Sequence, residues 1–229
     1  MELPRSREEL ARLIDHTLLN PAATPADVEK YCREVLDYGF WAVVVNPVYV
    51  SYAKYIIGGR AKVVSVVGFP FGATKPSVKV AEAEAAMDDG ADEIDLVMNI
   101  GAFKAGRHEL VEREVRAVAS VVHDYGGILK VIIETAYLTR EEIARASRIV
   151  VDAGADFVKT NTGYGPRGVT VEDVEVIRSA VGDRAGIKAA GGIRTAEQAL
   201  AVIRAGATRI GTSRGVDVIN SWLQDKMEK

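Results

Sequence analysis

The sequence predicts a single-domain (β/α)8 barrel, an α/β fold in which a helix follows each of eight parallel strands. Apolar runs of strand length recur eight times along the 229 residues, and a stretch with helical spacing follows each run. Valine-rich and isoleucine-rich strands that alternate with amphipathic helices are typical of a parallel sheet covered on both faces. No linker rich in Pro, Gly or Ser interrupts the alternation, so we expect one domain over residues 1–229. An open doubly wound sheet is the alternative.

The helices have recognisable ends, which place the strands between them. A short helix is expected before the first strand. Thr24 and Pro25 begin one helix as its N-cap and first residue, and Thr139 with Glu142 begins another as a capping box. Further helices are expected to end at Gly90, Gly154 and Gly206. The strands are then expected at residues 13–18, 42–46, 63–69, 93–99, 129–135, 156–162, 186–190 and 209–212.

The composition excludes several classes of function. A net charge of −3 and a pI near 5.7 give no general attraction to nucleic acid or to an anionic membrane. No apolar run approaches the ~18 residues of a membrane span. The first residues carry charges where a signal peptide needs an apolar stretch. We therefore expect a cytoplasmic protein that binds neither nucleic acid nor membrane, and any anionic ligand must be bound locally.

The cysteine and histidine content argues against two further kinds of site. A single cysteine, Cys32, excludes an intrachain disulfide, and its place in a predicted helix favours a core residue over a nucleophile. The three histidines, His16, His108 and His123, are not closely spaced with that cysteine. A zinc site is therefore not expected.

Lys159 lies inside an apolar run that otherwise has the character of a buried strand. Burial disfavours an ammonium group, so such a lysine is paired with a carboxylate or is left partly neutral and nucleophilic. A neutral lysine amine forms Schiff bases. Lys159 also lies near the C-terminal end of its strand, where barrels carry their chemistry. The alternative is an ammonium group that reaches solvent at the end of the strand.

Two other strands hold charges that a buried strand normally excludes. Asp95 faces the barrel interior if its neighbour Leu96 faces the helices, although it could instead form an ion pair at the bottom of the barrel. Lys188 precedes two glycines at the end of the next-to-last strand. We expect Lys159, Asp95 and Lys188 to converge, as an amine nucleophile with acid-base support does.

We also expect the Lys188 ammonium group to influence the pKa of Lys159 more strongly than Asp95 does, because a neighbouring cation lowers a lysine pKa. Two more charges, Lys130 and Glu134, lie in the fifth strand. Lys130 falls near the start of that strand, where charges in barrels contribute to stability. We therefore expect both residues to be structural.

Glycines lie where the last two strands end, at residues 191–192 and at residue 211. The loops after strands seven and eight of many barrels bind a phosphate through backbone N–H groups. Glycine permits that close approach, although it also serves in ordinary tight turns. The sequence therefore predicts a phosphate site at these two loops.

Seven segments, in this order, resemble the deoxyribose-phosphate aldolase family. They are DHTLL from residue 15, VVGFP from 66, EID from 93, KVIIET from 130, KTNTG from 159, KAAGGIR from 188 and RIGTS from 209. The resemblance extends over most of the chain and implies that Lys159 forms the Schiff base, with Asp95 and Lys188 as its proton-transfer partners. The substrate and phosphate contacts that we expect are Thr17, Thr162, Gly163, Gly191, Gly192, Gly211 and Ser213.

The resemblance implies a class I aldolase that reversibly cleaves 2-deoxy-D-ribose 5-phosphate to acetaldehyde and D-glyceraldehyde 3-phosphate. It also implies a homo-oligomer, and an enzyme that needs no metal or organic cofactor. Another phosphate-binding barrel enzyme, such as a sugar-phosphate isomerase, is one alternative, although it would not need paired lysines. A non-catalytic sugar-phosphate-binding barrel is the other. Two residues depart from the family pattern: Asn161, where serine is usual, and Arg214, where a small residue is common.

Overall fold

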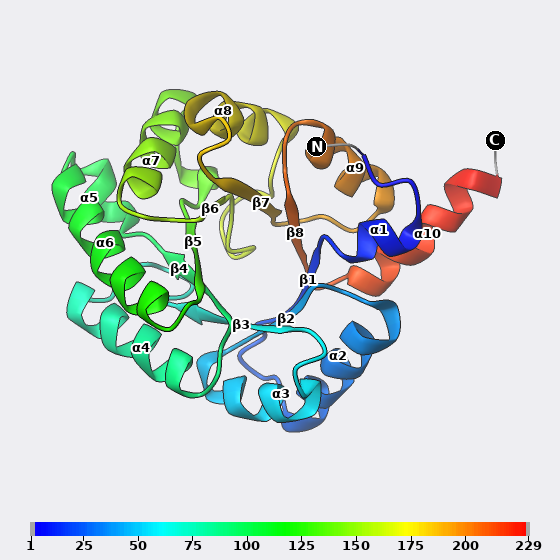
Figure 1. Ribbon diagram of the computed structural model, residues 1–229. Coiled ribbons are helices and arrows are strands. Elements are labelled where there is room, and N and C mark those ends of the chain that lie inside the picture. Colours follow the sequence, from blue (N-terminus) through cyan, green and yellow to red (C-terminus); the bar gives the residue numbers. More distant parts are fainter. Residues whose placement is uncertain (1–2, 228–229) are drawn as a thin grey trace.

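Eight parallel strands close into a barrel in chain order, and β1 pairs with β8 to complete the ring. The computed structural model describes residues 3–227, with side chains for residues 3–222. Figure 1 shows the strands at the centre and the helices around them. The strands are β1 (Ile14–Leu18), β2 (Ala42–Val45), β3 (Lys62–Val67), β4 (Glu93–Val97), β5 (Ile128–Ile132), β6 (Phe157–Lys159), β7 (Gly186–Ala190) and β8 (Arg209–Thr212).

The helices form the outer layer, and the last of them, α10, extends away from the ring (Figure 1). No helix in residues 3–227 is long and apolar enough to cross a membrane. The α-helices are α1 (Arg7–Ala11), α2 (Pro25–Tyr38), α3 (Val50–Ile57), α4 (Pro76–Asp88), α5 (Ile100–Lys104), α6 (His108–Asp124), α7 (Arg140–Asp152), α8 (Val171–Val181), α9 (Ala196–Arg204) and α10 (Gly215–Met227), and two 3-10 turns are η1 (Pro47–Tyr49) and η2 (Thr135–Tyr137).

The predicted barrel is confirmed, with every strand near its expected place and a short helix before β1. Four strands end two or three residues earlier than predicted: β3, β4, β5 and β6. The reason is visible after β6, where the backbone N–H of Thr162 donates to the Glu134 carboxylate at 3.2 Å instead of to a neighbouring strand. Polar side chains thus replace the sheet pairing where the loops begin.

The helix ends follow the local signals in the sequence. Thr24 and Thr139 both form capping boxes, with Asp27 and Glu142 respectively, and Pro25 occupies the first turn of α2. Each capping box satisfies two backbone N–H groups that a helix start otherwise leaves without partners. The glycines after α4, α7 and α9 have φ values of 95°, 106° and 120°, which end these helices as predicted.

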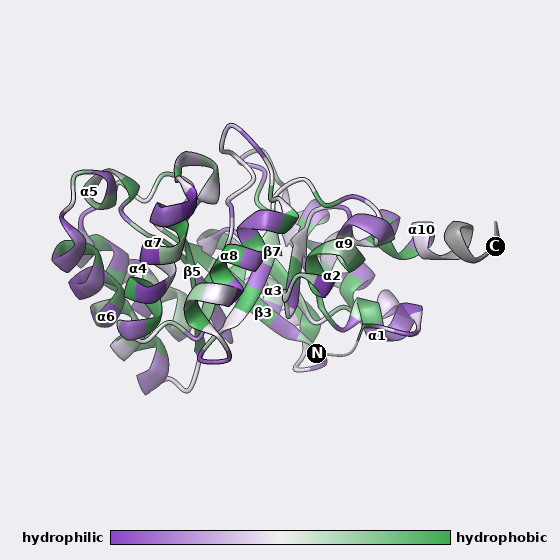
Figure 2. Cartoon of the chain, turned by 90° about the horizontal axis from the view of Figure 1, so that it is seen from above, coloured by the Kyte–Doolittle hydropathy of each residue, from purple (hydrophilic) through white to green (hydrophobic). Residues whose placement is uncertain are grey.

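The apolar residues form two separate clusters. The larger lies between the strands and the helices and contains Leu96 and Met98 of the β4 segment, so Asp95 points to the opposite side, into the barrel. Figure 2 shows green, hydrophobic stretches among the central strands, whereas outer helices such as α4 and α6 carry both hydrophobic and hydrophilic residues. The smaller cluster lines the interior on β2 and β3, with Ala42, Val44, Val64 and Val66. Asp95 on β4 and Lys130 on β5 are fully buried charged residues, and Val97 and Ile132 lie two residues further along the same strands.

Cys32 is fully buried in α2 and belongs to the larger cluster. Burial raises the pKa of its thiol to about 11. Because the thiolate is the reactive form, Cys32 is a core residue, as predicted.

Candidate active site

Lys159 is the last residue of β6, and its side chain is only 3% exposed. It lines a cavity of about 550 Å³ formed by loops that follow several of the strands. Its ammonium nitrogen lies 2.8 Å from Oδ2 of Asp95. The lysine is therefore both buried and open to a small ligand.

Asp95, in the middle of β4, contacts three lysines. Its Oδ2 accepts from Lys159 at 2.8 Å and from Lys188 at 2.7 Å, and its Oδ1 accepts from Lys130 at 2.8 Å. The strand register explains this convergence, because Asp95 pairs with Lys130 across β4 and β5, and Lys159 pairs with Lys188 across β6 and β7. The structure thus brings Lys159, Asp95 and Lys188 together as the sequence predicted.

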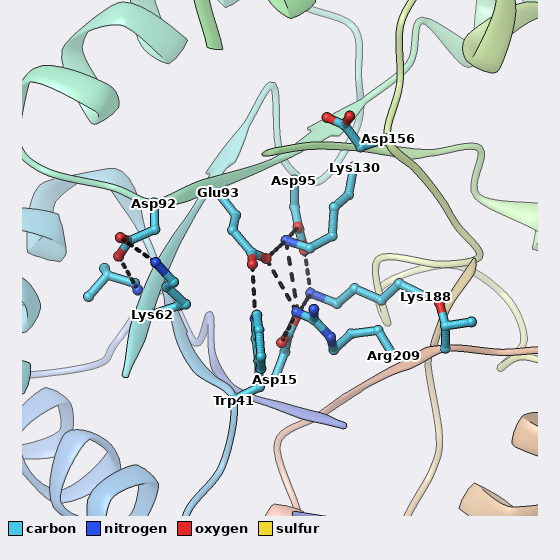
Figure 3. A network of polar contacts seen from close by, with 12 residues as sticks. Asp15, Trp41, Lys62, Asp92, Glu93, Asp95, Lys130, Asp156, Lys188 and Arg209 are labelled. Carbon is cyan, nitrogen blue, oxygen red and sulfur yellow. Dashed lines mark hydrogen bonds and ion pairs between the residues drawn. The ribbon is translucent and has the colours of Figure 1, made fainter. Parts of the chain in front are cut away.

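Four more side chains surround this group on the side away from the cavity. Lys188 lies 2.6 Å from Asp15, which also pairs with Arg209 at 3.0 Å. Glu93 lies 2.5 Å from Lys130 and accepts from the Trp41 indole at 2.9 Å. Figure 3 shows these side chains pointing toward one another. They come from β1, β4, β5, β7 and β8, and Trp41 lies just before β2. We call the seven ionisable members the charge cluster: Asp15, Glu93, Asp95, Lys130, Lys159, Lys188 and Arg209.

The charge cluster explains which lysine can lose its proton. It contains three carboxylates and four cationic side chains, so it is balanced when one cation is neutral. Lys188 has two carboxylate partners and Lys130 has three within 4.0 Å, whereas Lys159 contacts Asp95 alone. Lys159 also lines the cavity, and the other two do not. It is therefore the amine best placed to act as a nucleophile.

The pKa of Lys159 is lowered from 10.5 to about 8. Burial is the largest cause, because it disfavours the charged amine. The Asp95 carboxylate acts in the opposite direction, and the Lys188 ammonium group lowers the pKa by less than Asp95 raises it. The expectation that Lys188 outweighs Asp95 is therefore wrong. Asp95 contacts Lys159 directly, whereas the charge of Lys188 is compensated by two carboxylates.

The neighbouring groups are held in their charged forms. Burial alone would raise the pKa of Asp95, but Lys130, Lys159 and Lys188 hold it well below its usual range. Burial alone would lower the pKa of Lys130, but Asp95, Glu93 and Asp15 raise it above its usual value. The expectation that Lys130 is only a structural residue near a strand start is thus incomplete, because its ammonium group stabilises the Asp95 carboxylate.

The cavity wall contains eight of the ten predicted site residues: Thr17, Lys159, Thr162, Gly163, Gly191, Gly192, Gly211 and Ser213. Asp95 and Lys188 are fully buried behind this wall and reach the cavity only through Lys159. The wall also contains Tyr31, Tyr164 and Arg194, which sequence reasoning did not select as site residues. The two tyrosines lie on a helix and a loop with no buried-charge signal, so only the folded chain places them there.

Gly191 and Gly192 follow β7 with φ values of 103° and 85°, a backbone conformation that side chains rarely adopt. Arg194 and Arg214 both line the cavity beside these glycine loops, and Arg214 also pairs with Asp217 at 3.0 Å. Gly211 has an additional packing role, because a Cβ atom there would lie 3.0 Å from Cε of Lys188. The loops thus combine exposed backbone with two cationic side chains.

Asn161 is fully buried behind the loop that follows β5. Its side-chain oxygen accepts from the backbone N–H of Ala136 at 3.1 Å and from the Thr135 hydroxyl at 3.0 Å. This departure from the family pattern therefore fixes a neighbouring loop and leaves Lys159 in place. In residues 3–222, no group of three or more His, Cys, Asp or Glu side chains could hold a metal ion.

Comparison with known proteins agrees with this geometry. Residues 10–221 match the model of the DeoC/LacD family of aldolases. The chain is 54% identical over 214 residues to a deoxyribose-phosphate aldolase of Thermococcus gammatolerans, covering 92% of this chain and 95% of that protein.

Two solved structures are also similar. A tetrameric deoxyribose phosphate aldolase from Aeropyrum pernix superposes with a TM-score of 0.86 at 38% identity, over 95% of this chain and 92% of that one. For a putative deoxyribose-phosphate aldolase from Coccidioides immitis the TM-score is 0.92 at 38% identity, over 97% and 88% of the two chains. The protein therefore belongs to the DeoC/LacD family of aldolases.

Proposed function

We propose that the protein is a class I aldolase that reversibly cleaves 2-deoxy-D-ribose 5-phosphate into acetaldehyde and D-glyceraldehyde 3-phosphate. The observation that carries the proposal is Lys159, a buried amine with a pKa of about 8 that faces a cavity and contacts a carboxylate. The names of the relatives support the substrate. A sugar-phosphate isomerase would leave this amine without a role.

In the cleavage direction, the neutral amine of Lys159 attacks the C1 aldehyde of the open-chain sugar. Loss of water gives a protonated imine, which accepts the electron pair of the C2–C3 bond as that bond breaks. The C3 hydroxyl loses its proton and becomes the aldehyde of D-glyceraldehyde 3-phosphate. The enamine left on Lys159 gains a proton at C2, and hydrolysis of the resulting imine releases acetaldehyde.

Asp95 and Lys188 are proposed to move the protons in these steps. Asp95 shares one oxygen, Oδ2, between the ammonium groups of Lys159 and Lys188, so a proton can pass among the three groups without a large movement. In the synthetic direction the same groups, with water, would remove the Cα proton of the acetaldehyde imine. Both residues are buried behind Lys159, which limits the exchange of these protons with bulk solvent.

The substrate phosphate is proposed to bind at the C-terminal ends of β6, β7 and β8 and at the loops that follow them, on Gly163, Gly191, Gly192, Gly211 and Ser213. Thr17 and Thr162 are proposed as further substrate contacts. These residues line one cavity with Lys159, which supports a ligand that reaches from the amine to the glycine loops. Arg194 and Arg214 would add positive charge, although the protein as a whole is acidic.

A substitution at Gly192 tests the phosphate site. Gly192 has a positive φ and an open Cβ position, so Gly192→Val would distort the loop and cover its N–H groups without meeting a close neighbour. We expect kcat/KM for 2-deoxyribose 5-phosphate to fall at least about tenfold more than for unphosphorylated 2-deoxyribose. Steady-state assays with both sugars measure the ratio. Equal losses for the two substrates would contradict a phosphate site at this loop.

We further propose that residues 1–229 form one domain and that this domain assembles into a homo-oligomer. The tetrameric relative from A. pernix supports assembly. The outer surface of η1 and α3 supports it too, because Val48 of η1 is 78% exposed and Tyr55 of α3 is 83% exposed. Sedimentation velocity should give a mass above that of one chain, and Tyr55→Glu should lower it.

The proposed reaction is tested directly by product analysis. Purified protein incubated with 2-deoxy-D-ribose 5-phosphate should release acetaldehyde and D-glyceraldehyde 3-phosphate in equal amounts, and prior treatment with EDTA should leave the rate unchanged. Coupled assays for the two aldehydes measure both products. Isomerised sugar phosphate as the product would reject the aldolase assignment in favour of the isomerase, and binding without turnover would favour a non-catalytic barrel.

A further inference from the structure

Glu134 is the one described non-glycine residue with a positive φ, 44°, in residues 3–227. Its backbone lies in the left-handed region, which glutamate rarely adopts and which persists only when the surroundings enforce it. The side chain is 2% exposed. A strained and buried carboxylate directly after β5 needs an explanation that its expected structural role does not supply.

The strain accompanies an irregularity in the pairing of β5 with β6. The N–H of Ile133 donates to the Lys159 carbonyl, and the N–H of Thr135 donates to the Thr160 carbonyl, both at 3.0 Å. The β5 side thus advances two residues while the β6 side advances one, as in a β-bulge. Bulges near active sites redirect a side chain. Here the irregularity directs Glu134 under the loop that carries Thr162.

The Glu134 carboxylate holds that loop through one oxygen. Its Oε2 accepts the backbone N–H of Thr162 at 3.2 Å and also the Thr162 hydroxyl. Its other oxygen, Oε1, has no hydrogen-bond partner among the described residues and packs against Gly165, where a Cβ atom would lie 2.6 Å from it. The carboxylate is therefore enclosed by the loop after β6.

This contact decides what the Thr162 hydroxyl can offer to a substrate. A hydroxyl has one hydrogen to donate and two lone pairs. The hydrogen goes to Glu134, and one lone pair accepts the N–H of Tyr164 at 3.0 Å. The remaining lone pair belongs to a residue of the cavity wall. Thr162 can then only accept a hydrogen bond, so it suits a substrate hydroxyl group.

We propose that Glu134 is a positioning residue that fixes Thr162 as a hydrogen-bond acceptor for a hydroxyl of the sugar phosphate. The proposal rests on the aldolase function proposed above. In the synthetic direction, this hydroxyl is the one on C2 of D-glyceraldehyde 3-phosphate, next to the reacting aldehyde. Glu134 itself touches no reacting atom and transfers no proton.

The test measures the addition of acetaldehyde to each of two acceptor aldehydes. One is D-glyceraldehyde 3-phosphate, and the other is 3-phosphooxypropanal, which lacks the C2 hydroxyl. The readout is the acceptor ratio, which is kcat/KM for D-glyceraldehyde 3-phosphate divided by kcat/KM for 3-phosphooxypropanal. Glu134→Ala and Thr162→Val should each lower this ratio at least about tenfold, because the site then loses its oriented acceptor. The double variant should be no worse than Thr162→Val alone, since both changes remove the same contact.

Conservative variants separate positioning from other roles. Glu134→Gln keeps an oxygen that accepts from Thr162, and Thr162→Ser keeps the hydroxyl, so both should retain the ratio within about threefold. If the ratio fell as far in Glu134→Gln as in Glu134→Ala, the negative charge of Glu134, and not its positioning of Thr162, would be responsible for the preference between the two aldehydes. Should Glu134→Ala fail to fold, Thr162→Ser against Thr162→Val still decides the matter, because equal ratios in these two would overturn the proposal.

A matched control addresses the loss of a buried carboxylate as such. Glu114 of α6 is also buried and pairs with Lys79, outside the barrel and away from the cavity. Glu114→Gln should lower the thermal stability without changing the ratio for the two aldehydes. An unchanged ratio in Glu134→Ala would reject the proposal even if its stability fell. Reductive trapping of acetaldehyde on Lys159 in the same variants reports separately on the aldolase function.

Discussion

Replacing Lys159 with alanine should abolish turnover of 2-deoxyribose 5-phosphate, with kcat falling at least about 10⁴-fold, because the covalent intermediate can no longer form. The fold should survive. Lys159 contacts one carboxylate, and Asp95 keeps its contacts with Lys130 and Lys188 after the substitution. Removing one of four cationic groups also leaves the charge cluster balanced. Steady-state kinetics and thermal unfolding of the same preparation measure both effects.

The matched control for this substitution is Lys104→Ala. Lys104 is an exposed lysine of α5 that pairs with Glu142, and it does not line the cavity. Its loss should leave kcat within about twofold of wild type, since a surface ion pair contributes little. A Lys159→Ala protein that is folded and retains more than a hundredth of the wild-type kcat would show that another group performs the covalent step.

Lys188→Leu and Asp95→Asn should move the pH dependence of imine formation in opposite directions. The neutral amine reacts, so in wild type the rate should rise with pH through a midpoint near 8, the pKa of Lys159. Lys188 lowers that pKa and Asp95 raises it. The midpoint should therefore rise above 8 in Lys188→Leu and fall below 8 in Asp95→Asn. Turnover at pH 7 should fall about 10²-fold to 10⁴-fold in both.

The initial rate of reductive trapping with acetaldehyde, measured from pH 6 to pH 10, gives these midpoints. Each variant removes a buried charge that pairs with at least two neighbours, and should be destabilised by about 3–5 kcal/mol. The rates are therefore compared at a temperature where both remain folded. Wild-type protein and Lys104→Ala provide the reference midpoint. An unchanged midpoint in Lys188→Leu would mean that Lys188 relays protons only, and that burial alone activates Lys159.

Much of the barrel was predictable because two local signals coincide in this chain. Period-two alternation in the strands placed Asp95 inside the barrel, and capping boxes at Thr24 and Thr139 marked helix starts. A charged residue inside an apolar strand is costly unless it is paired, so Lys159 and Lys188 could be singled out from sequence alone. Strand order then brought them together, because parallel neighbours in a barrel place equivalent positions side by side.

The relative strengths of the charge interactions within the site could not be predicted in the same way. Lys130 looked like a stabilising residue near a strand start, but the register of β4 and β5 places it opposite Asp95. Asp15 and Arg209 compensate one another across β1 and β8, which no spacing in the sequence indicates. The relative influence of Asp95 and Lys188 on Lys159 depends on such compensation. It therefore required the three-dimensional arrangement.

Glu134 illustrates a third kind of information that the sequence lacks. As a charge at the end of an apolar strand it is indistinguishable from an ordinary surface glutamate. Its function depends on a left-handed backbone conformation and on an offset between β5 and β6. Both arise from how the two strands meet, and the residue types alone do not encode them.

The central claim, that Lys159 is the Schiff-base lysine, is tested most directly by locating the covalent adduct. Wild-type protein is incubated with acetaldehyde, reduced with borohydride, digested and mapped by mass spectrometry. We expect one reduced two-carbon adduct, on the peptide that contains Lys159, because this amine alone among the three buried lysines of the charge cluster lines the cavity. An adduct on Lys188 or Lys130, or no adduct in a protein that turns over substrate, would contradict the claim.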